Sequence, residues 1–92
     1  MVMKSLENLK NDIYKRMNEI SSFVIDSSKI LNEDDTYNYD ELNAYFDRNK
    51  KKSYMKAACM RLIKIYLNRK YGEWSFCSKD YSDYVNDFKK FG

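Results

Sequence analysis

The sequence predicts a small all-α domain of four helices. Three observations indicate this fold class. Apolar residues recur at three- and four-residue intervals in several stretches, and residue types that begin and end helices flank these stretches. Pro is absent and Gly occurs only twice in 92 residues, so few positions interrupt a helix. With 43% hydrophobic residues the chain can bury one modest core. We therefore expect residues 1–92 to form a single domain.

The first helix is expected from Ser5 to about Leu31. Ser5 can cap its start, and its apolar side chains recur on one side. The apolar positions of this stretch are Leu6, Leu9, Ile13, Met17, Ile20, Val24 and Leu31. A helix of about 26 residues would be roughly 39 Å long, which is long for a chain of this size. Either it bends or breaks near residues 26–28, or part of its apolar side contacts a second copy. We therefore expect either a monomer or a homodimer that associates through the first helix.

The second helix is expected to be short, over Tyr39–Asp47. The preceding residues, 32–39, are rich in Asn and Asp and predict a turn. Asn38 followed by Glu41 resembles a capping box, with Asp40 as a competing cap. A connection over residues 48–52 is expected to follow.

The third helix has the clearest signals. Ser53 is a plausible N-cap, and Gly72 supplies the left-handed residue that commonly ends a helix. Apolar residues such as Cys59 and Ile63 cover one broad side, and basic residues cover the opposite side. We expect this helix to be central.

The last part of the chain predicts a short aromatic segment and a fourth helix. Residues 73–78 carry Trp74 and Phe76, which are expected to fold back on one end of the bundle. The fourth helix is expected from about Lys79 to Phe91, with Ser78 as its cap.

Charge is distributed unevenly along the chain, although the net charge is only +3. An acidic block, residues 32–47, carries six carboxylates and no base. A basic segment, residues 48–71, carries no acid and nine cations. These cations are Arg48, Lys50, Lys51, Lys52, Lys56, Arg61, Lys64, Arg69 and Lys70.

This pattern favours a nucleic-acid interface on the basic segment. Lys50–Lys52 would precede the N-terminus of the third helix, whose free N–H groups attract anions. Phosphate contacts would release condensed counterions, and Tyr54 could stack on an unpaired base, which favours RNA or single-stranded DNA. The residues expected to bind nucleic acid are Arg48, Lys50, Lys51, Lys52, Tyr54, Lys56, Arg61, Lys64 and Arg69.

Two other interpretations remain open. The same surface, together with nine Tyr residues, would suit a protein partner with an acidic surface. The protein would then be an inhibitor or adaptor, such as a small phage or viral protein that blocks a host factor. The abundance of Asn, Lys, Ile and Tyr is typical of AT-rich genomes, including those of many phages. Alternatively, the basic residues form a solvated helix face that maintains solubility.

Other classes of site are not indicated. The absence of His removes His-based catalysis and His metal sites. A calcium loop over residues 32–43 would have Tyr37 where Gly is needed and Asn43 where a bidentate Glu is needed. Cys59 and Cys77 lack partner ligands for zinc, and Cys59 is expected in the core. We therefore expect a non-enzymatic protein without cofactor or metal.

Two further expectations concern a DNA-binding motif and the compartment in which the protein is located. Residues 39–47 and 53–71 could form a helix-turn-helix, although the connection is long and lacks Gly. No stretch is apolar enough for a membrane span or a signal peptide. We expect a cytoplasmic protein, located in the host cell if it is viral.

Overall fold

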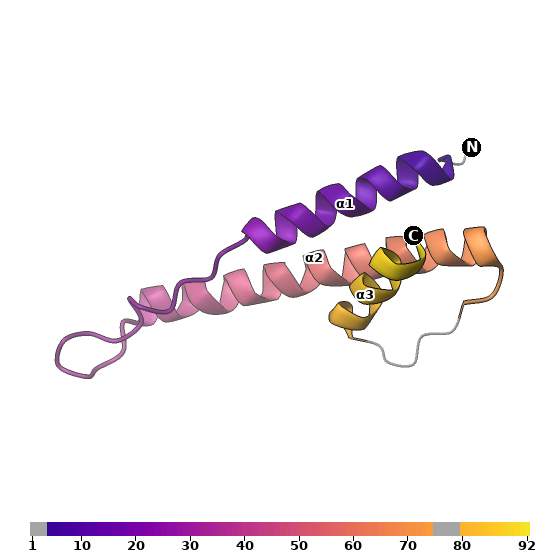
Figure 1. Ribbon diagram of the computed structural model, residues 1–92. Helices are drawn as coiled ribbons and strands as arrows, with labels where there is room; N and C mark the ends of the chain where they lie inside the picture. Colours follow the sequence, from indigo (N-terminus) through magenta and orange to yellow (C-terminus); the bar gives the residue numbers. More distant parts are fainter. Residues whose placement is uncertain (1–3, 75–79) are drawn as a thin grey trace.

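The computed structural model describes residues 4–74 and 80–92, and the part of the chain that it describes forms three helices (Figure 1). These are α1 (Leu6–Ser22), α2 (Tyr39–Tyr71) and α3 (Tyr81–Phe91). The all-α class is confirmed, but four helices were expected. The number is wrong because the expected second and third helices are one continuous helix.

Helix α1 starts where the sequence predicts and ends earlier. The Ser5 side chain accepts a hydrogen bond from the Asn8 backbone N–H, as an N-cap does. The helix stops at Ser22 instead of continuing to Leu31. Ser21 and Ser22 compete for backbone hydrogen bonds and favour termination there. The expectation of a dimer through the first helix rested on a longer helix than the structure has.

Helix α2 runs through the expected connection at residues 48–52 and is about 50 Å long at the usual rise. Asn38 caps it by accepting from the Glu41 N–H, and Gly72 ends it with a φ of 86°. Ser53 lies inside the helix and does not cap it. Lys and Arg have high helix propensity, so the basic stretch continues the helix instead of interrupting it. Among the described residues, therefore, no helix-turn-helix exists between residues 39 and 71.

Residues 23–38 connect α1 to α2 without a helix of their own. The isolated bridge between Leu31 and Tyr37 closes a tight loop, in which Asp35 adopts a φ of 64°. The Asp34 carboxylate accepts hydrogen bonds from the backbone N–H and the hydroxyl of Thr36, which lower the pKa of Asp34. Asp34 therefore keeps its charge at neutral pH.

The core lies where α1 and α3 pack against the C-terminal half of α2. Phe88 of α3 is fully buried, and its ring contacts those of Tyr14 and Tyr66 edge to face. The buried side chains among the described residues are Leu9, Ile13, Ile20, Cys59, Ile63, Tyr66, Leu67 and Phe88. Those contributed by α2 all come from residues 59–67, so the N-terminal half of this helix contributes none of them.

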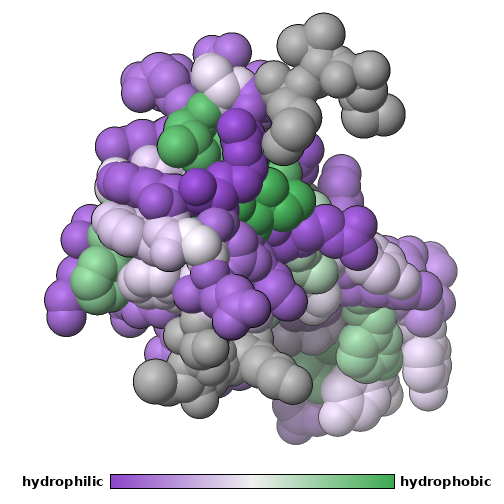
Figure 2. All heavy atoms as spheres, turned by 90° about the vertical axis from the view of Figure 1, so that its right-hand side faces the viewer, coloured by the Kyte–Doolittle hydropathy of each residue, from purple (hydrophilic) through white to green (hydrophobic). Residues whose placement is uncertain are grey.

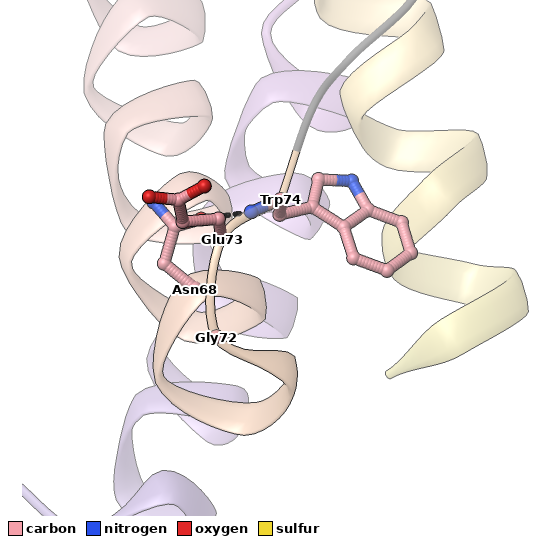
Figure 3. Close-up of a pocket in the computed structure, with 4 residues that line it drawn as sticks. All are labelled: Asn68, Gly72, Glu73 and Trp74. Atoms are coloured by element: carbon pink, nitrogen blue, oxygen red, sulfur yellow. Dashed lines mark hydrogen bonds between the residues drawn. The ribbon is translucent and has the colours of Figure 1, made fainter.

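The end of α2 is fixed by a turn that brings Trp74 back to the bundle. Figure 3 shows the Trp74 backbone N–H donating to the Asn68 side-chain oxygen, at 2.7 Å. The indole ring lies 4.8 Å from the Phe91 ring, centroid to centroid, and its N–H donates to Asp87. The predicted return of Trp74 is therefore confirmed. Phe76, Cys77 and the proposed cap Ser78 lie outside the described residues, and α3 is described from Tyr81, next to Asp80.

The molecule is elongated. It measures 57 × 29 × 19 Å, with a radius of gyration of 17.3 Å, whereas a compact domain of this length would have about 12 Å. In Figure 1 the first half of α2 and the loop before it project past α1 and α3. We call residues 23–54 the arm.

Candidate nucleic-acid interface

The nine cations of the basic segment all lie on α2. Because the helix is continuous through residues 48–52, Lys50–Lys52 do not precede a helix N-terminus. The expected anion site formed by free N–H groups is therefore wrong. The cations are instead distributed around most of the circumference of the helix, and they do not form a single patch of nine.

Five of the nine cations contact groups of the chain that lie outside α2. The Lys52 ammonium donates to the Phe23 carbonyl, and the Arg69 guanidinium donates to the Lys4 carbonyl. Lys70 donates to the carbonyls of Phe91 and Gly92. Lys51 and Lys56 lie over the rings of Phe23 and Tyr81, each 5.7 Å from the centroid. These contacts hold the connection that follows α1, the N-terminus and α3 against α2.

These contacts are made to main-chain oxygens and aromatic rings, so none of them pairs a cation of α2 with a side-chain carboxylate. Within residues 4–74 and 80–92 the one ion pair recorded joins Lys4 to Asp12 of α1. No carboxylate of the acidic block pairs with the basic segment there. The cations of α2 therefore have no side-chain carboxylate within ion-pair distance in the described part of the chain.

A subset of the cations lies on the outward side of α2. Lys50, Arg61 and Lys64 are exposed, and the spacing of eleven and three residues places them on one side of the helix. Tyr54 lies in the same row and is 65% exposed, with the Lys50 ammonium 6.0 Å from its ring centroid. We call these four residues the outer stripe. Arg48 is also exposed. It lies near Asp26, whose pKa is lowered chiefly by hydrogen bonds from Ser28 and to a smaller extent by the charges of Lys29 and Arg48.

The outer stripe lies opposite the core. Cys59, Ile63 and Leu67, on the other side of α2, are fully buried. From Lys50 to Lys64 the stripe spans fifteen residues, and the fourteen steps between them cover roughly 21 Å of helix. In the described part of the chain, neither Arg61 nor Lys64 pairs with a carboxylate or lies over an aromatic ring, so their charged groups are free to meet a ligand.

The surface around the end of α2 is mostly polar. Figure 2 shows that end of the molecule, where hydrophilic side chains cover most of the view and hydrophobic ones are few and separate. A hollow of about 640 Å³ there is lined by Asn68, Gly72, Glu73 and Trp74 (Figure 3). Glu73 is the one carboxylate among these lining residues, so they provide no pair of acidic groups for acid–base chemistry. In the described part of the chain, no group of three or more metal-ligating side chains occurs.

The buried thiol of Cys59 is not an activated nucleophile. Burial raises its pKa, while a hydrogen bond from the Tyr81 hydroxyl and the charge of Arg16 only partly oppose this. A reactive cysteine needs a lowered pKa and access to solvent, and Cys59 has neither. Its place in the core was predicted from the sequence. Burial, together with the neighbouring Cys59, also raises the pKa of Tyr81 to about 12.

The Cys59–Tyr81 contact predicts a loss of stability at alkaline pH. In the unfolded chain the two groups ionise near their ordinary pKa values of 9.0 and 10.0. The folded state holds both protons more tightly, so its stability is complete below these values and falls as the pH rises towards 12. Urea unfolding between pH 7 and 11 should show a weaker decline for Tyr81→Phe than for the wild type. Tyr39→Phe, which changes an exposed Tyr, should decline like the wild type, and equal declines for all three would contradict the assignment.

Comparisons with known proteins give no further identification. Neither a protein family, nor a curated protein, nor a solved structure matches this chain. In the described residues, no helix is long and apolar enough to cross a membrane.

Proposed function

We propose that this protein is a small non-enzymatic regulator that binds single-stranded nucleic acid, with RNA favoured, through the outer stripe of α2. The observation that supports this most directly is the row Lys50, Arg61 and Lys64 on the side of the helix opposite the core. Cations in a row bind a phosphate backbone by releasing its condensed counterions.

The five cations with internal contacts have a secondary role in this proposal. Lys51, Lys52, Lys56, Arg69 and Lys70 add to the positive field that attracts the polyanion. Their contacts within the chain make them less available for direct phosphate binding. The interface proposed is therefore narrower than the nine cations of the basic segment.

Tyr54 distinguishes single strands from duplexes. Its ring is exposed beside Lys50, and an exposed ring beside a cation can stack on an unpaired base. In a duplex the bases are already stacked on one another. We therefore expect stronger binding to single strands, and Tyr54→Ala should weaken this binding more than duplex binding.

A salt titration tests the proposal. Labelled single-stranded RNA is titrated with wild type and with the double variant Arg61→Ala/Lys64→Ala at several salt concentrations. For single strands, each phosphate contact contributes roughly −0.7 to the slope of log K against log salt. The double variant should therefore have a slope shallower by about 1.4.

The matched control is Lys89→Ala/Lys90→Ala. It removes the same charge from exposed positions of α3, and it should retain most of the wild-type slope. If both double variants lose the same slope, binding is a general effect of net charge and the stripe is not the interface. If the wild type does not bind RNA or DNA even at low salt, the proposal is wrong.

A second function is supported by the aromatic residues near the stripe. Tyr54 and Tyr71 are exposed, and Tyr and Arg are enriched at the centres of protein interfaces. An inhibitor or adaptor that binds a protein with an acidic surface would use the same side of α2. Such a partner would be captured by the wild type and lost with Arg61→Glu/Lys64→Glu, whereas RNA would not bind to either.

A further inference from the structure

The N-terminal half of α2 has an exposed face that the packing of this chain leaves uncovered. Residues 39–54 contribute no buried side chain, although they form almost half of the longest helix. One side of this half is contacted by the connection from α1, through Lys51 and Lys52 on Phe23. The opposite side carries large apolar side chains that face solvent.

Three aromatic residues dominate this face. Tyr39 is 72%, Phe46 58% and Tyr54 65% exposed. Their spacing of seven and eight residues places them on one side of the helix, together with Asn43 and Lys50. A row of apolar residues at helical spacing on a helix surface is typical of a face that packs against another helix.

The charges beside these aromatic residues have a fixed order along the helix. Asp40 and Asp47 are exposed in the first part of the face, and Lys50 is exposed just after them. An antiparallel pair of such helices brings the acidic part of each copy to the basic part of the other. A parallel pair would place like charges together. The charges on this face are therefore complementary to those of a second copy only when the two helices are antiparallel.

We propose that two copies of this chain associate through the N-terminal halves of their α2 helices, antiparallel and related by a two-fold axis. In the arrangement that we infer, Asp47 of each copy faces Lys50 of the other. The contact is isologous, so it closes at two copies and does not propagate. This proposal does not depend on nucleic-acid binding.

The area available suits a reversible dimer. An aromatic side chain buries about 150–250 Å² when fully covered. From the exposed fractions of Tyr39, Phe46 and Tyr54, the three rings can cover roughly 300–450 Å² per copy. That is about half of the area of a standard interface, before the stems of Asn43 and Lys50 are added. We therefore expect a dimer that dissociates on dilution.

Lys50 and Tyr54 belong to both the outer stripe and this face. They cannot contact a second copy and a phosphate backbone at the same time. Lys64 lies beyond the inferred overlap and stays available in the dimer. Association is therefore measured without nucleic acid, so that its outcome is separate from that of the RNA titration.

Reciprocal charge reversal tests the proposal by sedimentation equilibrium at several protein concentrations. Asp47→Lys alone and Lys50→Glu alone each place like charges across the axis and should weaken dimerisation by about tenfold or more. An equimolar mixture of the two variants restores opposite charges at both positions. The mixture should therefore associate at least as tightly as the wild type.

The controls reverse the same charges elsewhere. Glu19→Lys and Lys89→Glu lie at exposed positions of α1 and α3, and both should dimerise like the wild type. Phe46→Ser should also weaken association, because it removes the central ring. A wild type that is monomeric at all concentrations overturns the proposal. A dimer that neither reversal weakens, or a mixture that does not recover, overturns it as well, even if the arm then captures a different protein.

Discussion

Replacing Phe88 by alanine will cost the protein about 3–5 kcal/mol of folding free energy. The ring is fully buried, and it contacts the rings of Tyr14 on α1 and Tyr66 on α2. It is therefore the fully buried side chain of α3, and it contacts both of the other helices. The variant leaves a cavity that the neighbouring rings cannot fill without leaving their edge-to-face geometry. Urea unfolding followed by circular dichroism at neutral pH measures the loss.

Phe46→Ala is the matched control for this loss. It removes the same ring from a position that is 58% exposed, and exposed substitutions away from special features change stability by only about 0.5 kcal/mol. Both variants are compared at concentrations low enough to keep the chain monomeric. Similar losses for Phe88 and Phe46 would show that the core is not organised around α3.

Lys50→Pro will break α2 and cost about 3 kcal/mol of helix free energy. In a continuous helix the N–H of residue 50 bonds to the carbonyl of Phe46, and proline both removes this donor and clashes with that carbonyl. Far-UV circular dichroism should show a loss of helix, and backbone chemical shifts should place it around residues 46–50.

Lys50→Ala is the control, since alanine keeps the N–H and has high helix propensity. It should retain the full helical signal. If residues 48–52 formed a connection between two helices, proline would be accepted there with little change. Equal helicity in the two variants would therefore contradict the continuous helix.

The start of α1 and both ends of α2 were predictable because single residues determine them. Ser5 and Asn38 accept backbone hydrogen bonds as N-caps, and Gly72 adopts the positive φ that residues with a Cβ rarely adopt. These effects are local, so the sequence contains the information needed to locate them.

The continuity of α2 was not predictable from the same pattern. The expected connection at residues 48–52 coincides with a stretch that has no apolar residue. Apolar periodicity reports which side of a helix is buried, and the N-terminal half of α2 contributes no buried side chain. Helix propensity was the better guide there, because the Lys and Arg residues favour helix without requiring burial.

The candidate site was predictable in its charge and not in its shape. The separation of six acids from nine cations follows from the order of residues alone. Which side of the helix each cation faces depends on whether the helix continues through residues 48–52. The contacts that engage Lys52, Arg69 and Lys70 join residues more than twenty positions apart in the chain. Contacts between distant residues therefore engage several of the nine cations and leave the outer stripe exposed.

The elongated shape has a consequence for how this protein moves through solution. A particle measuring 57 × 29 × 19 Å experiences more friction than a sphere of equal mass, so it diffuses more slowly. A single copy will therefore leave a gel-filtration column earlier than its 11.1 kDa would suggest, at a volume that imitates a larger particle. Its rotation is also anisotropic, because spinning about the axis of α2 is faster than tumbling end over end.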